Sequence, residues 1–425
     1  MVVYTSIAVF LFSAIALVVP TGFSAGAVML LAGSVVLLLR RDRATLEREE
    51  MALISVLVFY FLVATLSNAV HGAPLREYDS PLRFLLVIPV LFLLRVFPPI
   101  PRFFWGGVAV GAISSGLFAA WQIFSAGGTR ADGFTNPIQF GNICMLLAVS
   151  CIAGIGWAVS QRRAVFWSTL LSGGIALGLL GAFITGSRGS WISLPVALLV
   201  AYRCYGGALN RRHIAVGLGA MLVLVAVLDT VPRLSMEARV QDAVKETRDY
   251  FVSGDATTSV GIRLEMWRTA LVLVPEHAWL GWGKDGYIKQ TESLVAAGKA
   301  RSGLQVHTHL HNEYLDALVK RGLPGLAALL ALYLVPLVLF ARRIRDENHA
   351  VRPYALAGVL LIVNYMCFGL TQAFLTHNNG VMLLGFMLVI LWSLLRAQEG
   401  SVPATHPGPQ TDITKDCDRM LQKTI

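Results

Sequence analysis

The chain has 425 residues, of which 56% are hydrophobic and only 14% are charged, with a mean hydropathy of +0.65. This composition lies well outside the averages of soluble domains and predicts a polytopic integral membrane protein. The formal net charge is +10, but the basic residues lie mainly in short clusters between apolar runs. That pattern is typical of membrane topology and argues against a nucleic-acid partner.

Apolar runs of roughly 17 to 22 residues, each about long enough to cross a bilayer, follow one another along the chain. The predicted spans are residues 3–20, 23–39, 51–70, 81–97, 104–125, 139–159, 166–185, 190–205, 214–231, 323–341, 354–371 and 379–396. The predicted fold class is therefore all-α, a polytopic membrane protein with about twelve transmembrane helices.

Arginine and lysine gather in the connections after the even-numbered spans, such as "RRDRATLEREE" and "ARRIRDENHAVR". By the positive-inside rule, both termini are cytoplasmic and the long hydrophilic insert faces outward. Within the insert, "RLSMEARVQDAVKETRDYF" and "GIRLEMWRTALVLV" have the spacing of amphipathic helices, which we expect to lie on the bilayer surface and cap a cavity.

The predicted organisation has four parts. Residues 1–231 form the first nine transmembrane helices, residues 232–322 form a periplasmic loop with interfacial helices, and residues 323–398 form the last three transmembrane helices. The polar cytoplasmic tail, residues 399–425, is predicted to be disordered.

Polar residues at the outer border of the predicted spans are candidates for a functional site, because charged groups at membrane depth are costly. In "TGSRGSW", Arg188 stands between two glycines at the mouth of the seventh and eighth spans; an arginine that merely reaches the interface is the alternative. In "GIRLEMWR", Arg263 and Trp267 share a helical face. A solvated surface charge is the alternative there.

The stretch "HTHLHNEYLDALVKRGLPG" begins with three alternating histidines, His307, His309 and His311. In an extended chain they would share a face and could chelate a metal, whereas a solvated polar loop is the plainer interpretation. If instead a helix begins near His311, its imidazole lies at the first turn, Gly322 ends the helix in the left-handed conformation, and Pro324 opens the next span.

A histidine followed by asparagine, then nine residues and Gly-x-x-Gly, at the end of a large outward loop, resembles the lipopolysaccharide O-antigen ligases of the Wzy-C superfamily. These enzymes are relatives of O-antigen polymerases and O-linked oligosaccharyltransferases. The segments "GSRGSW" and "RLEMW" also look like superfamily elements. The resemblance implies that His311 is the essential histidine and that Arg188 and Arg263 bind the lipid diphosphate. The residues expected to support them are Asn312, Trp267, Gly322, Gly325, Arg83 and Asp79.

The implied activity is transfer of a preassembled glycan from undecaprenyl diphosphate to a sugar hydroxyl of lipid A-core, at the periplasmic face of the bacterial inner membrane. A neutral imidazole is a suitable general base for the hydroxyl, and planar guanidinium groups suit the leaving diphosphate. Direct attack would invert the anomeric centre, whereas a covalent glycosyl-enzyme would retain it. We expect no cofactor and no metal, because the arginines supply the positive charge.

Four alternatives stay open at this point. Glu77 and Asp79 in "REYDSPLR" could hold a metal, as in glycosyltransferases of the GT-C type, or Asp79 could pair with Arg76 or Arg83. A polymerase of the same superfamily would need the same residues. A lipid-linked glycan flippase or transporter would also suit twelve spans, although transporters place their critical charges near the membrane midplane and show internal repeats. A zinc hydrolase built on the histidines is the most distant alternative.

Overall fold

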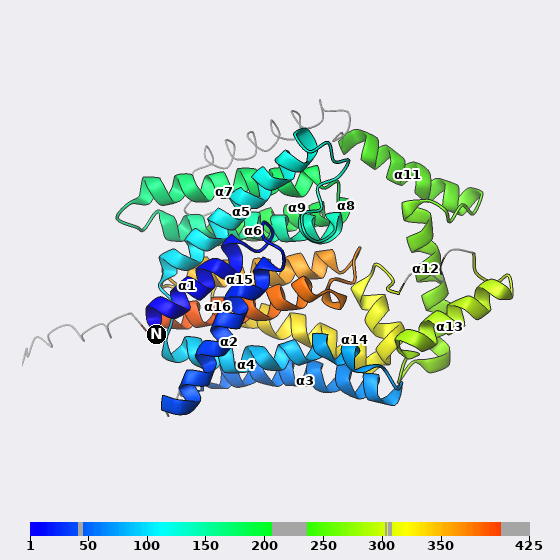
Figure 1. Ribbon diagram of the computed structural model, residues 1–425, viewed down its shortest axis with the longest axis horizontal. Coiled ribbons are helices and arrows are strands. Elements are labelled where there is room, and N and C mark those ends of the chain that lie inside the picture. Colours follow the sequence, from blue (N-terminus) through cyan, green and yellow to red (C-terminus); the bar gives the residue numbers. More distant parts are fainter. Residues whose placement is uncertain (41–45, 206–235, 302–303, 305–307, 401–425) are drawn as a thin grey trace, which may run out of the picture.

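The computed structural model describes residues 1–40, 46–205, 236–301, 304 and 308–400. Throughout these residues the secondary structure is helical and contains no β-strand, and most of the helices pack side by side in one bundle (Figure 1). The predicted all-α class is therefore confirmed.

The first half of the chain supplies α1 (Val2–Ala14), α2 (Gly22–Arg40), α3 (Arg48–Val70), η1 (Leu75–Tyr78), α4 (Asp79–Val96), α5 (Pro101–Phe124), α6 (Pro137–Ala158), α7 (Ala164–Ile184), α8 (Arg188–Trp191) and α9 (Ser193–Tyr205). The second half supplies α11 (Met236–Val252), α12 (Ser259–Leu273), η2 (Val274–His277), α13 (Gly283–Ala296), α14 (Glu313–Ala341), α15 (Arg352–Phe368), η4 (Phe374–Thr376) and α16 (Asn378–Glu399).

The long apolar helices α3, α5, α6, α7, α14 and α16 are the six described helices that have the length and composition to cross a membrane. Helices α1 and α15 and residues 22–37 of α2 are apolar but shorter. Each predicted span within the described residues overlaps a helix, but the first one, 3–20, is only partly helical, because α1 ends at Ala14. The ninth predicted span, 214–231, and the tail after residue 400 lie outside those residues, and the count of twelve stays a prediction.

The centre of the bundle is formed by α6 and α16. Their most apolar windows are 83% and 89% buried, whereas the corresponding window of α3 is only 28% buried. Leu62 and Leu66 on α3 are accordingly exposed. Contiguous exposed apolar surface of this kind marks a face that contacts lipid in a membrane protein.

Helices α11, α12 and α13 of the insert stand together at one end of the bundle (Figure 1). They have small apolar cores of their own, in which Met266 packs with Ala300 and Leu304, and Leu273 and Tyr287 pack with the start of α14. The helices predicted in the insert are thus present, and they place the end of the insert against α14.

A break at Gly322 divides α14. This glycine has φ 65° and ψ −165°, so the predicted positive φ is confirmed, but the predicted left-handed helical conformation is wrong. Gly322 adopts the extended positive-φ region that only glycine tolerates, because the backbone of the break pairs with the loop before α13. The Leu323 amide donates to the Ala278 carbonyl (2.8 Å), and the Trp282 amide donates to the Val319 carbonyl (2.9 Å).

We expect Gly322→Ala to lower the melting temperature of the detergent-solubilised protein. A Cβ at this position would lie 2.2 Å from the Trp279 carbonyl oxygen, in addition to the strain of its positive φ, which is worth about 1–3 kcal/mol. Gly298→Ala is the matched control, since Gly298 has φ 68° but open space around it. Equal melting temperatures for the two variants would show that the contact with the loop contributes nothing.

Candidate functional site

His311 lies in the last turn of backbone before α14. Its φ is 51°, a value shared among the described non-glycine residues only by Thr21, and a positive φ on such a residue is a mark of local strain that often accompanies function. Asn312 caps the helix, since its side-chain oxygen accepts from the amides of Tyr314 (3.1 Å) and Leu315 (3.0 Å). The role of Asn312 is therefore to fix where the helix starts, and so where His311 points.

Gln372, in the connection between α15 and α16, holds the imidazole of His311. The side chain of Gln372 is buried, and its carbonyl oxygen accepts from Nδ1 of His311 at 2.8 Å. Its amide nitrogen donates to Nε2 of His377 at 2.8 Å. With the amide in this orientation, Nδ1 of His311 carries the proton, and Nε2 holds the lone pair of the neutral ring.

His309 packs beside His311. The two ring centroids are 4.3 Å apart, and the ring of His377 lies 5.6 Å from that of His309. Burial, followed by the nearby His311, lowers the pKa of His309 to about 3, and burial also lowers the pKa of His377. The ring of His309 is therefore neutral around pH 7. His307, the first member of the alternating run, lies outside the described residues.

Arg188 and Arg263 come from different elements but share one region. Burial and then the positive charges of Arg188 and Arg130 lower the pKa of Arg263. Arg130 also donates from Nε to the Thr185 carbonyl at 2.9 Å, directly before the glycine-flanked turn that carries Arg188. The positive charges of Arg188 and Arg130 thus lie near enough to Arg263 to act on it.

Both elements that carry these arginines touch the segments that hold His311. On α12, Trp267 donates from its indole nitrogen to the Leu310 carbonyl at 3.0 Å. On α8, Gly189 lies against Thr371, so closely that a Cβ would come within 2.0 Å of its hydroxyl oxygen. Leu310 precedes His311, and Thr371 precedes the glutamine that binds it. The structure therefore places the two elements that carry the predicted arginines against the residues next to His311 and next to Gln372.

The two glycines of the motif act on the backbone. Gly322 makes the break described above, and a Cβ on Gly325 would lie 2.3 Å from Cβ of Arg321 and 3.0 Å from the Ala317 carbonyl. Close packing across the broken turn therefore requires a glycine at position 325 as well.

The acidic pair of Glu77 and Asp79, where η1 meets α4, is engaged by cations. Asp79 accepts from Arg83 at 2.5 Å, which is one of the pairings that the sequence left open, and Glu77 accepts from Lys284 of α13 at 2.6 Å. Arg76 lies 3.7 Å from Glu77. Within the described part of the chain, no three His, Cys, Asp or Glu side chains are grouped as a metal site.

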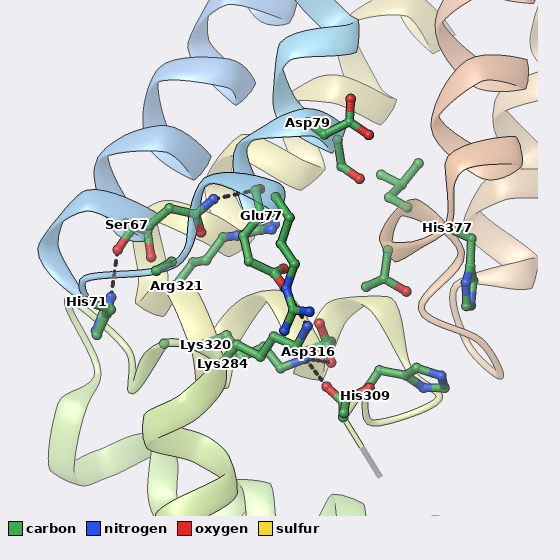
Figure 2. A pocket seen from close by; sticks show the side chains of 18 of the residues that line it. Ser67, His71, Glu77, Asp79, Lys284, His309, Asp316, Lys320, Arg321 and His377 are labelled. Carbon is green, nitrogen blue, oxygen red and sulfur yellow. Dashed lines mark hydrogen bonds and ion pairs between the residues drawn. The ribbon is translucent and has the colours of Figure 1, made fainter.

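A polar cavity of about 540 Å³ adjoins the histidines. Figure 2 shows that Asp316 and Lys320 from α14, Lys284 from α13 and Glu77 from η1 converge on it, with His309 and His377 at one side. Its described lining consists of Ser67, Asn68, His71, Ala73, Arg76, Glu77, Asp79, Ser80, Gly283, Lys284, Thr308, His309, Asp316, Lys320, Arg321, Leu375, Thr376, His377 and Asn378.

Sequence reasoning missed Gln372, His377 and the cavity. The signal available for the first two was the polar run "TQAFLTHNN" between the last two predicted spans, on the same predicted side as His311. Lys320 and Asp316 are spaced i, i+4 within the quoted motif, and their side chains form a buried ion pair of 2.6 Å.

Comparison with known proteins gives two matches. The Wzy_C family model, described as O-antigen ligase, matches residues 173–330, a segment that contains the two predicted arginines, the histidine and both glycines of the motif. An uncharacterized protein of Haemophilus influenzae is 29% identical over 367 residues, which cover 86% of this chain and 91% of that protein. The second match extends the similarity over most of the bundle.

Proposed function

Because the chain belongs to the Wzy-C superfamily, whose members are membrane enzymes of the glycosyltransferase type, we propose that it is an O-antigen ligase. It transfers a preassembled glycan from undecaprenyl diphosphate to a sugar hydroxyl of lipid A-core. The observation that carries this proposal is the position of His311, held between two elements that each bring an arginine.

The proposed reaction is a direct displacement. Nε2 of His311 takes the proton of the acceptor hydroxyl as its oxygen bonds to the anomeric carbon. The bond from that carbon to the phosphate oxygen breaks, and the diphosphate leaves with the electron pair. Attack from the face opposite the leaving group inverts the anomeric centre.

Arg188 and Arg263 hold the diphosphate in this account. A guanidinium group stays protonated and binds phosphate oxygens through two parallel N–H donors. Burial and then the positive charges of Arg188 and Arg130 lower the pKa of Arg263, and an anion bound among the three arginines offsets this repulsion. The cluster is therefore better suited to a doubly charged leaving group than to a neutral sugar.

Product identity tests the function. Purified protein is incubated with undecaprenyl-diphosphate glycan and lipid A-core, and the products are separated by mass. A ligase yields lipid A-core that carries the glycan. Lengthened lipid-linked glycan would instead assign the chain as a polymerase, and unchanged substrates that only cross the membrane of a vesicle would assign it as a flippase.

We expect transfer to persist in excess EDTA, because the arginines neutralise the diphosphate and the acidic pair is engaged by Arg83 and Lys284. The rate is measured before and after chelation, with magnesium and manganese restored separately. Loss of transfer in EDTA that either metal restores would reinstate Glu77 and Asp79 as metal ligands.

The proposed location is the bacterial inner membrane, with both termini cytoplasmic and the site facing the periplasm. Reporter tags near residues 45, 208 or 348 should then report the cytoplasm, and tags near 255 or 295 should report the periplasm. A cytoplasmic signal from residue 295 would place the site on the wrong side for lipid A-core.

A further inference from the structure

We propose that the polar cavity beside His309 and His377 binds the sugar moiety of the acceptor and presents its hydroxyl to His311. This inference rests on the proposed function, which requires an acceptor but does not locate it. The cavity is a separate compartment from the arginine cluster, since its lining includes none of Arg130, Arg188 and Arg263.

The position of the cavity fits an acceptor. Its wall contains His309, whose ring lies 4.3 Å from that of His311, and His377, which shares Gln372 with His311. A sugar that fills the cavity therefore ends next to the proposed base. The arginines hold the diphosphate from α12, whose Trp267 contacts the residue before His311, and from the turn that carries Arg188. The two substrates therefore meet at the histidine.

The ion pairs of the lining suit a sugar. Lys284 is paired with Glu77, and Lys320 with Asp316, each at 2.6 Å. The N–H groups and carboxylate lone pairs that these pairs leave over are strong partners for hydroxyls. The other two cations of the lining, Arg76 and Arg321, lie 3.7 Å from Glu77 and 3.4 Å from the Tyr60 hydroxyl, respectively. The arginine cluster differs from this lining, because its positive charges repel one another.

The rest of the lining also suits a polyhydroxylated ligand. Hydroxyl and amide side chains contribute from four separate segments, namely Ser67 and Asn68 on α3, Ser80 on α4, Thr308 before α14, and Thr376 and Asn378 around the start of α16. A volume of about 540 Å³ lies within the range of ligand sites, roughly 300–1,000 Å³.

The test measures binding of a lipid-free, dephosphorylated core oligosaccharide to the purified full-length protein by isothermal titration calorimetry. Lys284→Gln removes a charged donor and should weaken binding about tenfold. Thr376→Trp places a large ring at an exposed position of the wall and should abolish binding. Lys289→Gln, an exposed lysine on the same helix outside the lining, is the control and should bind as the wild type does.

The same variants are then assayed for transfer. We expect KM for lipid A-core to rise in Lys284→Gln and Thr376→Trp while KM for the lipid-linked donor stays unchanged. Unaltered oligosaccharide binding in both variants, no binding to the wild type, or a rise in donor KM would overturn the assignment. Binding without any transfer by the wild type would count against the ligase function and still support the cavity as a sugar site.

Discussion

His311→Ala should reduce glycan transfer by about 10²- to 10⁴-fold, the usual contribution of a general base, while the protein still folds and inserts. The ring of His311 is half-buried and contacts Gln372 and His309, and we expect its removal to leave the bundle intact. His349→Ala is the control, because His349 is exposed and distant in sequence. It measures the effect of losing an imidazole elsewhere in the chain. His307→Ala and His309→Ala should reduce transfer less. Near-normal transfer by His311→Ala would show that His311 is not the general base.

The pH dependence of transfer gives the same prediction a second readout. Activity requires the neutral form of His311, so the rate should rise with increasing pH along its acid limb and then level off. Gln372→Glu places a carboxylate on Nδ1, which favours the protonated ring, and should therefore shift that limb to higher pH. Gln372→Leu should lower the rate without such a shift, because it only releases the orientation of the ring. An unshifted limb in Gln372→Glu would show that His311 does not set the pH profile.

Alanine at Arg188 or Arg263 should each weaken donor use by about ten- to a hundredfold. A charge-assisted hydrogen bond in a partly desolvated site is worth roughly 1.5–3 kcal/mol, and about 1.4 kcal/mol corresponds to a factor of ten. Lysine should rescue only in part, since it keeps the charge but loses the planar fork. We expect Arg188→Lys to be the worse of the two, because the turn that carries it is wedged against Thr371 and cannot move to compensate.

Donor saturation at fixed acceptor checks this division of labour, with Arg248→Ala on the exposed face of α11 as the control. If only acceptor dependence suffers, the two arginines bind phosphates of lipid A-core. The diphosphate would then have to be held elsewhere, by Arg76, Arg83 or Arg130.

The parts of the fold that the sequence predicts are those set by local composition. Long apolar runs become helices over most of their length in the described chain, and the glycine at 322 breaks α14. Both outcomes depend on the residues themselves and their immediate neighbours. The Asp79–Arg83 pair is local in the same sense, since an i, i+4 spacing brings the two side chains together on a helix. The conformation of Gly322 was mispredicted, because the loop at 278–282 that pairs with it is distant in sequence.

The candidate site is predictable only in part, for the same reason. The resemblance of three short motifs identifies His311, Arg188 and Arg263 one by one. The contact of His311 with Gln372 joins residues 61 positions apart, and it depends on how α14 packs against α15 and α16. The cavity depends on side chains from α3, η1, α13 and α14 at once, and no spacing within any one of these segments predicts their convergence.

The anomeric configuration of the new linkage tests the central claim, that His311 activates the acceptor for direct displacement of the diphosphate. Product made by the purified protein from a donor of known configuration is examined by NMR. The account predicts an inverted centre. Retention would require a covalent glycosyl-enzyme, and would contradict the assignment of His311 as a base acting directly on the acceptor hydroxyl.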